Sequence, residues 1–337
     1  MTLRMKTLVS GGHQPVLVEE VLRFLNFPGS RCIVDGTVGS GGHAAALLQA
    51  TPSSVRLIGL DRDPEALKGA AKRLDPYEGR FSLYQASYKN LEEILNQNPL
   101  STVDGILLDL GLSSMQLEIA ERGFSFQKEG PLDMRFDPDS SKTAADLVAK
   151  ATEKELSDLF WRYGEERHSR RIARAIVQAR QLRPITTTRQ LAELAQRTLP
   201  WQGGRRLHPA TRVFQALRIA VNEELSALEH FLGHALDFLS PGGRLCILSY
   251  HSLEDRQVKE AFRRWQREGQ ARILTKKPIQ SSESEIRNNP RARSAKLRAA
   301  EKLEPPAHGD AILISHRNKY RVPPFGGGQG GVDGERN

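Results

Sequence analysis

The hydrophobic positions in the first third of the chain follow two alternating spacings. Short continuous apolar runs bounded by turn residues predict strands over residues 32–34, 55–61, 80–86 and 104–110. Apolar residues that recur every three to four positions predict helices over residues 16–25, 44–50, 64–74 and 90–95. Strands that alternate with helices indicate βαβ units, so we expect a parallel sheet with helices on both faces.

This alternation stops after the fourth predicted strand. From about Ser114 to Arg212 only helical spacing remains. Residues 172–177 carry an apolar stripe with arginines around it, and Thr187 with Gln190 matches a capping box. We interpret this stretch as a helical insertion in the α/β fold.

The α/β pattern resumes after the insertion. It predicts a long helix over residues 222–239, followed by strands over residues 244–250, 272–275 and 310–317. The last two strands are short and could close the sheet. Residues 325–337 are rich in glycine, which is typical of a disordered tail.

Charge is distributed unevenly along the 337 residues, whose net charge is +9. Residues 161–220 hold 13 Lys and Arg against 3 Asp and Glu, and residues 256–302 hold 14 against 5. The rest of the chain is therefore net acidic. Two basic segments on an acidic body favour a nucleic-acid partner, although solvated helix faces would give the same composition.

Cysteine use and the lengths of the apolar runs restrict the class of protein. Cys32 and Cys246 are far apart, and each lies in an apolar run, so we expect two buried free thiols. No stretch approaches the roughly 20 apolar residues of a membrane span, and the apolar segment that ends at Val9 is too short for a secretory signal. These features favour a cytoplasmic protein. The nine histidines are scattered, and we expect no metal site.

A glycine-rich turn, IVDGTVGSGGH over residues 33–43, follows the first predicted strand. Asp35 ends the strand, and four glycines follow within seven residues. Glycine lets the backbone approach a ligand closely, and the turn lies at the carboxyl edge of the sheet, where open α/β folds bind ligands. The pattern therefore predicts a nucleotide-cofactor site. A P-loop is excluded because no Gly-Lys-Ser/Thr follows.

Two cofactors compete for this turn. The letters GSGGHA from Gly39 satisfy the dinucleotide fingerprint of NAD enzymes, and Asp61 follows about 20 residues on. Asp35 and Asp109, at the ends of the first and fourth strands, instead favour S-adenosylmethionine. Their carboxylates would repel a pyrophosphate and attract a sulfonium and an ammonium group. In either case Asp61 would bind the ribose hydroxyls; its alternative role is a helix N-cap, for which Asp63 is better placed.

A series of longer motifs runs through most of the chain. They are HQPVLVEEV from His13, DGTVGSGGH from Asp35, GLDRDPEAL from Gly59, DGILLDLGLSS from Asp104, RGFSFQKEGPLDMRFD from Arg122, YGEERHSRRIARAIV from Tyr163, HPATRVFQALRIAVNEEL from His208, PGGRLCILSYHSLEDR from Pro241 and NPRARSAKLRAAE from Asn289. With these motifs the chain resembles the bacterial cytosine-N4 methyltransferases that modify 16S ribosomal RNA, the MraW or RsmH family.

The resemblance implies a class I S-adenosylmethionine-dependent methyltransferase fold. This is a Rossmann-like α/β fold with a mostly parallel seven-stranded sheet and, here, an inserted all-helical domain. We expect residues 1–113 and 216–324 to form the two parts of the methyltransferase core. Residues 114–215 would form the helical insertion, with a role in RNA binding, and residues 325–337 the disordered tail.

The resemblance also implies a set of cofactor contacts. It assigns them to Gly41, Gly42, His43, Asp61, Tyr88, Asp109 and Gln116, and the turn itself adds Asp35 and Gly39. The family often has phenylalanine where Tyr88 stands, and an aromatic residue is common where Val38 stands. An aromatic ring at position 88 can still lie against the adenine.

The implied reaction methylates the exocyclic N4 amine of the cytidine at position 1402 of 16S ribosomal RNA, in the decoding region of the small ribosomal subunit. This amine is a poor nucleophile because its lone pair is delocalised, so acceptors must hold its N–H groups and aim it. In related amino-methyltransferases an Asp/Asn-Pro-Pro-aromatic turn does this. The corresponding turn here, DLGLSS from Asp109, has neither proline nor an aromatic residue. Asp109 is the first candidate acceptor, with Ser113 as a helper.

Without an aromatic residue in that turn, the target base must stack elsewhere. The candidates are Tyr250, Phe124 and Phe126, and core packing is the alternative for the two phenylalanines. A base inside folded RNA must also leave its stack, while cations hold the flanking backbone. The side chains that we expect to contact RNA are Arg167, Arg170, Arg171, Arg174, Tyr250, His251, Arg291, Arg293, Lys296 and Arg298. For His251 a helix cap is the alternative, and we expect His208 to be structural.

Three other functions remain as alternatives. An NAD-dependent oxidoreductase would need a hydride-transfer site, and the sequence shows no coherent set of residues for one. A non-catalytic RNA-binding protein would not need the acids and glycines of the turn. A methyltransferase that acts on DNA or protein shares the turn, so only the insertion and DLGLSS argue against it. The expected partner is 16S ribosomal RNA within the small ribosomal subunit, and the sequence gives no oligomeric state.

Overall fold

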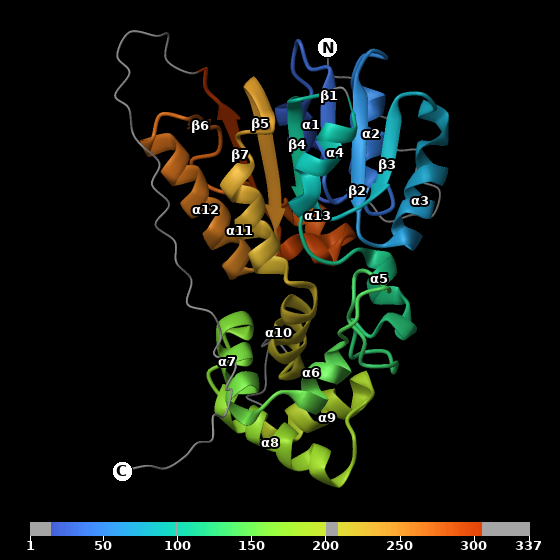
Figure 1. The fold of residues 1–337 in the computed structure, drawn as a ribbon, viewed down its shortest axis with the longest axis vertical. Coiled ribbons are helices and arrows are strands. Elements are labelled where there is room, and N and C mark those ends of the chain that lie inside the picture. The colour runs from blue at the N-terminus through green and yellow to red at the C-terminus, as the bar shows by residue number, and fades with distance from the viewer. Residues whose placement is uncertain (1–14, 99, 200–207, 305–337) are drawn as a thin grey trace, which may run out of the picture. The chain divides into compact units, whose positions relative to one another are not determined.

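Seven strands form one sheet in the order β3-β2-β1-β4-β5-β7-β6 (Figure 1). The computed structural model describes residues 15–98, 100–199 and 208–304. The strands are β1 (Cys32–Asp35), β2 (Arg56–Asp61), β3 (Phe81–Gln85), β4 (Val103–Asp109), β5 (Leu239–Ser249), β6 (Ala271–Ile273) and β7 (Lys296–Lys302). Strands β1 to β5 run parallel, and β7 is antiparallel to β5 and β6. The expected mostly parallel seven-stranded sheet is confirmed.

Most of the predicted strands are present in this sheet. The first four match β1 to β4 within about two residues, and those predicted over residues 244–250 and 272–275 correspond to β5 and β6, although β5 begins earlier, at Leu239. Strand β7 was not predicted at all, because its charged residues were assigned to RNA binding. In the structure Leu297, Ala299 and Ala300 are buried between β5 and β6. The strand predicted over residues 310–317 and the tail over residues 325–337 lie outside the described residues.

Helices cover both faces of the sheet. They are α1 (Val18–Leu25), α2 (Gly42–Ala50), α3 (Pro64–Leu74), α4 (Leu91–Gln97), α11 (Glu224–His234), α12 (Ser252–Arg267) and α13 (Glu283–Asn288). Buried side chains of α1, α2 and α3 share one hydrophobic cluster with the sheet, and those of α4, α11 and α12 share another. The two clusters are the two faces of a doubly covered α/β sheet.

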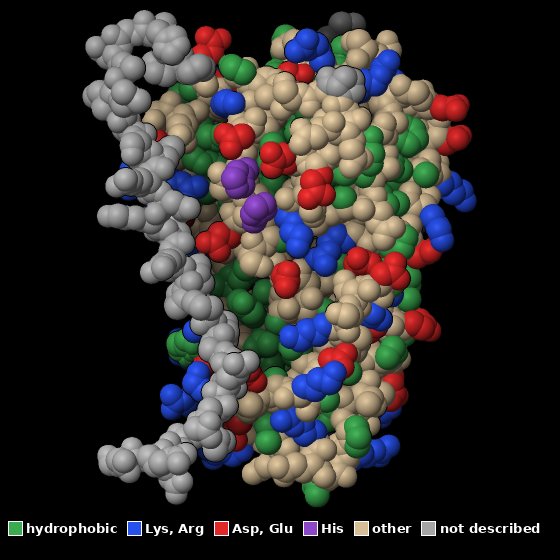
Figure 2. Space-filling view, in the orientation of Figure 1, with side chains coloured by type: hydrophobic (Ala, Val, Ile, Leu, Met, Phe, Trp, Pro, Cys, Tyr) green, Lys and Arg blue, Asp and Glu red, His purple; other side chains and the backbone are tan. Residues whose placement is uncertain are grey.

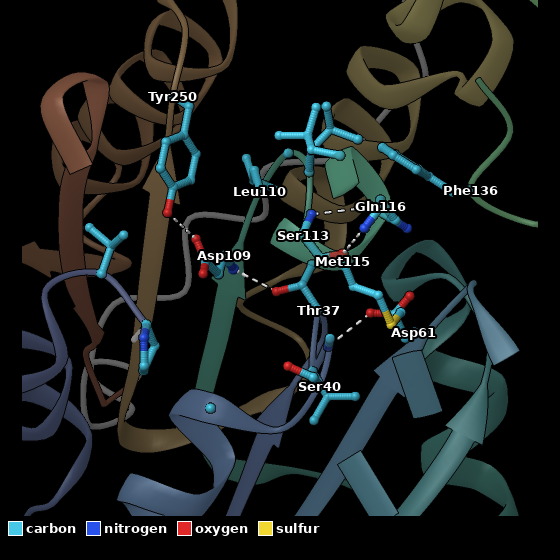
Figure 3. Close-up of a pocket in the computed structure, with 18 of the residues that line it drawn as sticks. Thr37, Ser40, Asp61, Asp109, Leu110, Ser113, Met115, Gln116, Phe136 and Tyr250 are labelled. Carbon is cyan, nitrogen blue, oxygen red and sulfur yellow. Dashed lines mark hydrogen bonds between the residues drawn. The ribbon is translucent and has the colours of Figure 1, made fainter. Parts of the chain in front are cut away.

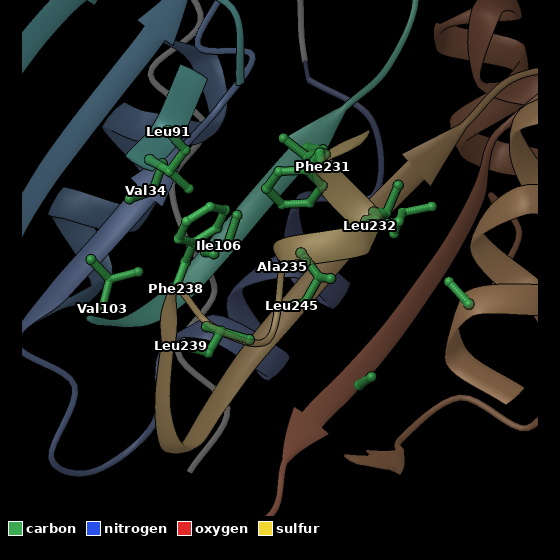
Figure 4. Close-up of a cluster of buried hydrophobic side chains, with 14 of the residues drawn as sticks. Val34, Leu91, Val103, Ile106, Phe231, Leu232, Ala235, Phe238, Leu239 and Leu245 are labelled. Carbon is green, nitrogen blue, oxygen red and sulfur yellow. The ribbon is translucent and has the colours of Figure 1, made fainter. Parts of the chain in front are cut away.

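Figure 4 shows the cluster formed with α4 and α11. Phe231 on α11 is 1% exposed and packs with Phe238 and the residues of β4 and β5, among them Ile106 and Leu245. Fully burying one such side chain stabilises a fold by about 1.5 to 3 kcal/mol. This packing fixes the strand ends that carry the polar residues described below.

Helices also fill the chain between β4 and β5. They are α5 (Ser114–Glu118), α6 (Ala144–Lys150), α7 (Glu153–Gly164), α8 (Ser169–Leu182), α9 (Thr188–Thr198) and α10 (Ala210–Asn222). Helices α6 to α10 bury a hydrophobic cluster of their own, with Phe160 and Ile176 fully buried in it. Lys and Arg side chains are spread over this end of the molecule (Figure 2). The capping box of Thr187 and Gln190 is confirmed, and the domain boundaries at 113/114 and 215/216 stay predictions.

The helix predicted over residues 222–239 is present as α11, but it is shorter than predicted. Helix α10 ends at Asn222, Glu223 has a left-handed φ of 54°, and α11 begins at Glu224 and ends at His234. The apolar periodicity continues through the break, so spacing alone does not reveal it. The break matters for the site because it turns Asn222 and Glu224 toward the cavity described next.

Two smaller expectations concern the thiols and the membrane. Cys32 and Cys246 are both free and buried, as predicted, and burial raises the pKa of the Cys32 thiol to about 11. In the part of the chain that the structure describes, no helix combines the length and the hydropathy needed to cross a membrane.

Candidate active site

A cavity of about 1170 Å³ opens at the carboxyl ends of β1, β2, β4 and β5 (Figure 3). Its lining includes the glycine-rich turn after β1, Asp61 at the end of β2, the turn after β4, and Tyr250 after β5. Sites for one small molecule usually measure roughly 300 to 1000 Å³. This cavity is therefore large enough for a nucleotide cofactor together with part of a substrate.

The glycine-rich turn places backbone, and not side chains, against the cavity. Gly39 has φ of 53°, and a Cβ atom there would meet only the Thr37 carbonyl oxygen, at 3.9 Å. Gly42 also lines the cavity. Gly41 does not, because it faces α3, where a Cβ atom would lie 3.2 Å from the Ala70 Cα. Of the predicted cofactor-contacting glycines, Gly39 and Gly42 thus reach the cavity, and Gly41 allows α2 and α3 to pack closely.

Asp61 is fixed by two backbone N–H groups. Its Oδ2 accepts a hydrogen bond from Gly39 N at 2.9 Å, and its Oδ1 accepts one from Asp63 N at 2.9 Å. Burial raises the pKa of Asp61 to about 6. The alternative role as N-cap of α3 belongs to Asp63, whose Oδ1 accepts from Glu65 N. Asp61 is left at the cavity with carboxylate oxygens that suit a pair of hydroxyl groups.

Asp35 lies beneath the turn and does not line the cavity. Its side chain is 1% exposed and accepts one hydrogen bond, from Thr37 N at 3.2 Å. Burial raises the pKa of Asp35 to about 8, and the carboxylates of Asp109 and Asp61 add to the effect. Three carboxyl groups thus converge at one edge of the sheet. Since Asp35 keeps its proton below about pH 8, the charge at this edge comes from Asp61 and Asp109, which favour a cation over a pyrophosphate.

Asp109 is held between side chains from three different elements (Figure 3). Tyr250 Oη donates to Asp109 Oδ1 at 2.7 Å, and His43 Nδ1 lies 3.5 Å from Asp109 Oδ2. The Asp109 backbone N–H donates to Thr37 Oγ1 at 2.6 Å. His43 is anchored in turn by Nε2, which lies 2.9 Å from the Val16 carbonyl oxygen. The carboxylate therefore has a fixed orientation at the cavity wall.

Ser113 and Gln116 line the cavity, but their side chains already form hydrogen bonds with neighbouring residues. Ser113 Oγ accepts from Gln116 N at 3.2 Å, which caps α5, and Gln116 Oε1 accepts from Ser113 N in return. Gln116 Nε2 donates to Asp63 Oδ2 at 3.0 Å, and Arg122 pairs with the same oxygen at 2.6 Å. These bonds join the turn after β4 to the start of α3.

Three aromatic rings lie at the cavity. They are Tyr88, Phe136 and Tyr250, and Figure 3 shows Phe136 and Tyr250 on opposite sides of it. Tyr88 packs edge-on against Phe231, and burial raises its pKa. Of the other two rings proposed for base stacking, Phe124 stacks on Phe136, and Phe126 packs on Phe214.

Both phenylalanines belong to the hydrophobic cluster of the helices and not to the cavity lining, so core packing is the reading that holds for them. Phe136 was missed because it lies in an irregular segment with no periodic signal. Only its place in the motif RGFSFQKEGPLDMRFD could have drawn attention to it.

A buried group of polar residues closes the far side of the cavity. Arg218 donates to both carboxylate oxygens of Glu224, at 2.8 and 2.9 Å. Glu254 accepts from Tyr250 N, and its Oε1 lies 3.1 Å from His251 Nε2. Burial alone would raise the pKa of Glu254, but His251 and Arg218 together hold it below its usual value. Sequence reasoning missed Arg218, Glu224 and Glu254 because they lie far apart along the chain.

Within this group, ligand atoms of Glu224, His251 and Glu254 lie within 4.8 Å of one another, an arrangement that could hold a metal ion. Arg218 already balances the charge of Glu224. His251 caps α12, since its Nδ1 accepts from Glu254 N at 3.4 Å, so its predicted alternative role as a cap is present. The absence of a metal site stays a prediction.

The arginines expected to bind RNA lie in different places. Arg167, Arg170, Arg171 and Arg174 are exposed in and before α8 and do not line the cavity, whereas Arg291 lines it. Arg293 is exposed and lies outside the cavity lining.

Lys296 and Arg298 need a correction. They lie in β7 and pair with Asp255, at 3.3 and 2.7 Å, and Arg298 is only 8% exposed. Charge alternation on a strand was mistaken for an RNA-binding segment. His208, as expected, is structural and stacks on Phe126 with ring centroids 4.7 Å apart.

Comparison with known proteins identifies relatives over most of the chain. A model of the MraW methylase family matches residues 10–303. The protein named ribosomal RNA small subunit methyltransferase H from Nitratidesulfovibrio vulgaris (strain DP4) is 50% identical over 309 residues, which are 86% of this chain and 95% of that protein. The protein of the same name from Syntrophobacter fumaroxidans is 49% identical over 311 residues, 88% of this chain and 98% of that protein.

The solved structures are more distant. An rRNA methylase from Streptococcus thermophilus is 13% identical with a TM-score of 0.40, and the match covers 85% of this chain and 94% of that one. A Streptococcus mutans methyltransferase in complex with SAH is 13% identical with a TM-score of 0.36, covering 85% of this chain and 95% of that one. These likenesses are too weak to support any argument about the site.

Proposed function

The chain belongs to the MraW methylase family, and from this premise we propose that it methylates the N4 amine of a cytidine in 16S ribosomal RNA, in the decoding region of the small subunit. Its cofactor is S-adenosylmethionine, which decides between the two cofactors that the turn alone left open. The curated relatives are named for the RNA of the small ribosomal subunit. The choice of a cytidine amine rests on the resemblance and on the cavity.

The observation that carries the proposal is the fixed carboxylate of Asp109. An aromatic amine needs an acceptor that holds its N–H groups, so that the lone pair points at the methyl donor. Asp109 stands beside the glycine-rich turn, its Oδ1 occupied by Tyr250 Oη at 2.7 Å. Its Oδ2, near His43, is on the side of that turn. We assign to Asp109 the acceptor role for the cytidine amine.

The cavity fits the cofactor by the chemistry of its donors and acceptors. When bound, S-adenosylmethionine supplies an electrophilic methyl group on a sulfonium. Asp61 would hold the ribose hydroxyls, and Tyr88 would lie against the adenine. Gly39 and Gly42 have no side chains, so the cofactor could lie close to the backbone there. The carboxylates of Asp61 and Asp109 favour the positive charges of the cofactor.

The remaining space suits a nucleotide that has left its stack. Tyr250 and Phe136 offer aromatic faces, and Arg218 with Glu254 offers buried polar groups on the far side. A flipped base is commonly read by stacking and by hydrogen bonds to its edge. The amine that gains the methyl group becomes acidic, and its proton can pass to a carboxylate or to water.

The test uses purified full-length protein, labelled S-adenosylmethionine and small ribosomal subunits that lack the modification, followed by digestion of the RNA to nucleosides. We expect the label in N4-methylcytidine. Label in another nucleoside would contradict the choice of the amine. Cofactor binding without transfer to subunits or to free 16S RNA would favour a DNA or protein substrate instead.

A further inference from the structure

Trp161 on α7 is 59% exposed, and it is the only exposed Trp, Tyr or Phe side chain among the described residues. A single exposed apolar residue is ordinary on a protein surface and needs no function. Its neighbours therefore decide whether it has one. The hydrophobic stripe of α7 faces the other way, through Leu156 and Phe160, so the helix does not need Trp161 for its own packing.

Four arginines follow Trp161 within ten residues of the chain. Arg162, Arg167, Arg170 and Arg171 are all exposed, and within the described residues none of the four forms a salt bridge. Asp158, one turn before Trp161, interacts electrostatically with both Arg162 and Arg170. The surface formed here by α7 and α8 therefore has Arg162 and Arg170 near one carboxylate, which lies one helical turn from Trp161.

This surface reaches the mouth of the cavity. Glu165 directly follows the last residue of α7, four positions after Trp161, and accepts hydrogen bonds from Ser252 and Arg256, at the beginning of α12. Two residues of the same segment, Tyr250 and Glu254, line the cavity. We call Trp161, Arg162, Arg167, Arg170, Arg171 and Arg256 the arginine surface.

We propose that Trp161 is a stacking site for an unpaired base of the RNA substrate, outside the cavity that takes the methylated nucleotide. The surrounding arginines hold the phosphates on either side of that base. The inference rests on the proposed function, since it assumes an RNA substrate. An aromatic ring among unpaired cations is the usual composition of single-strand binding surfaces, because every base has a face that can stack. A protein partner would instead favour a larger apolar core with fewer charges.

The test measures the affinity of the full chain for a fluorescein-labelled, unstructured RNA of about 12 nucleotides, by anisotropy. We expect Trp161→Ala to weaken binding about tenfold, because a stacked base adds that order of affinity. Trp161→Phe keeps an aromatic face and should stay within about threefold of the wild type. Leu182→Ala is the matched control, because Leu182 is 91% exposed on α8 and lies outside the arginine surface.

A second probe separates stacking from charge. Heparin is a polyanion without bases, so Trp161→Ala should leave its affinity unchanged. If Trp161→Ala binds RNA as tightly as the wild type does, the inference is wrong, and contact with a protein partner becomes the better explanation for the exposed ring. An equal loss toward heparin would overturn it too, since the effect would then not come from a base.

Failure of the inference can be told apart from failure of the proposed function. If the wild type methylates small subunits while Trp161→Ala binds RNA normally, only the stacking site is wrong. If the wild type binds cofactor but neither binds nor methylates RNA, the proposed function fails as well.

Discussion

The acidic edge of the sheet and the arginine surface are both charged, but they hold their charges in opposite ways. Asp35 is 1% exposed, and Asp61 and Asp109 are fixed by hydrogen bonds from backbone and side chains. The arginines of the arginine surface are exposed, and among the described residues only Arg256, which pairs with Glu165, forms a salt bridge. The acids are therefore held in fixed positions, whereas most of the arginines are not.

The difference matches what each region has to recognise. A small cofactor must be held with its methyl group in line with the amine, and small displacements of a reacting pair are costly. Buried carboxylates also interact more strongly than exposed ones, because less water screens them. A long polyanion can be attracted by exposed cations in many registers, and that attraction depends on salt. The substitutions below test this division, from the largest expected effect to the smallest.

Loss of the Asp109 carboxylate should have the largest effect. We expect Asp109→Ala to lower the rate of methyl transfer about 1000-fold, because one preorganised contact at a reacting group contributes 100- to 1000-fold. Cofactor affinity, measured by calorimetry, should change far less. Asp109→Asn keeps one acceptor oxygen and should lose less activity than the alanine variant. A rate within tenfold of wild type for Asp109→Ala would show that another group holds the amine.

Removing three arginines should weaken RNA binding without touching the cofactor. We expect Arg167, Arg170 and Arg171, all replaced by Gln, to lower RNA affinity about 30-fold at low salt. The salt slope should fall by about 2, at roughly 0.7 per lost phosphate contact. The matched control removes the same charge elsewhere, with Gln at Arg183, Arg189 and Arg197. An equal loss of affinity in the control would mean that only net charge matters, and that the arginine surface is not a specific RNA-binding site.

Asp35→Asn should change how stability depends on pH. Because the pKa of Asp35 is raised to about 8, the native state keeps a proton that the unfolded chain releases near pH 4. The stability of the wild type therefore falls, through this group, as the pH rises from about 4 to 8. The asparagine variant does not lose stability in this way, so between pH 5 and 7 it should gain about 2 to 3 kcal/mol relative to wild type.

Urea unfolding at several pH values measures this difference. The difference in the free energy of unfolding between the two proteins should grow up to pH 8 and then stay constant. Asp61, whose pKa is also raised, remains in both proteins and cancels in the comparison. Parallel curves for the two proteins would mean that Asp35 is ionised throughout, and the acidic edge would carry one more charge than we infer.

Tyr250→Phe should have the smallest effect. It removes the hydroxyl that donates to Asp109 Oδ1 and keeps the ring. We expect the turnover rate to fall about fivefold to tenfold, in line with the net contribution of one ordinary hydrogen bond. The KM for S-adenosylmethionine should not change, which separates orientation of the carboxylate from cofactor binding. A raised KM with normal turnover would place Tyr250 in binding and not in orientation.

Much of the fold could be predicted because β1, β2 and β4 are short buried runs and regular helices separate the strands. The cofactor side of the site was predictable for the same reason, since Asp61 and Asp109 end strands and the glycines follow one. The polar group on the far side of the cavity could not be predicted from the sequence. Arg218, Glu224 and Glu254 come together through a helix break at Glu223 that leaves the apolar periodicity intact. Strand β7 was hidden because its Arg298 is neutralised by Asp255, a partner 43 residues away.

The place of β7 has a consequence for how the protein is made. It is the last strand along the described chain, yet it lies between β5 and β6 and bonds to both. Until residue 302 has left the ribosome, β5 has an open edge, and β6 has no neighbour in the sheet. Open edges invite pairing with other chains. During synthesis the nascent chain therefore carries its greatest risk of misassembly late, after the glycine-rich turn and most of the cavity lining have already been translated.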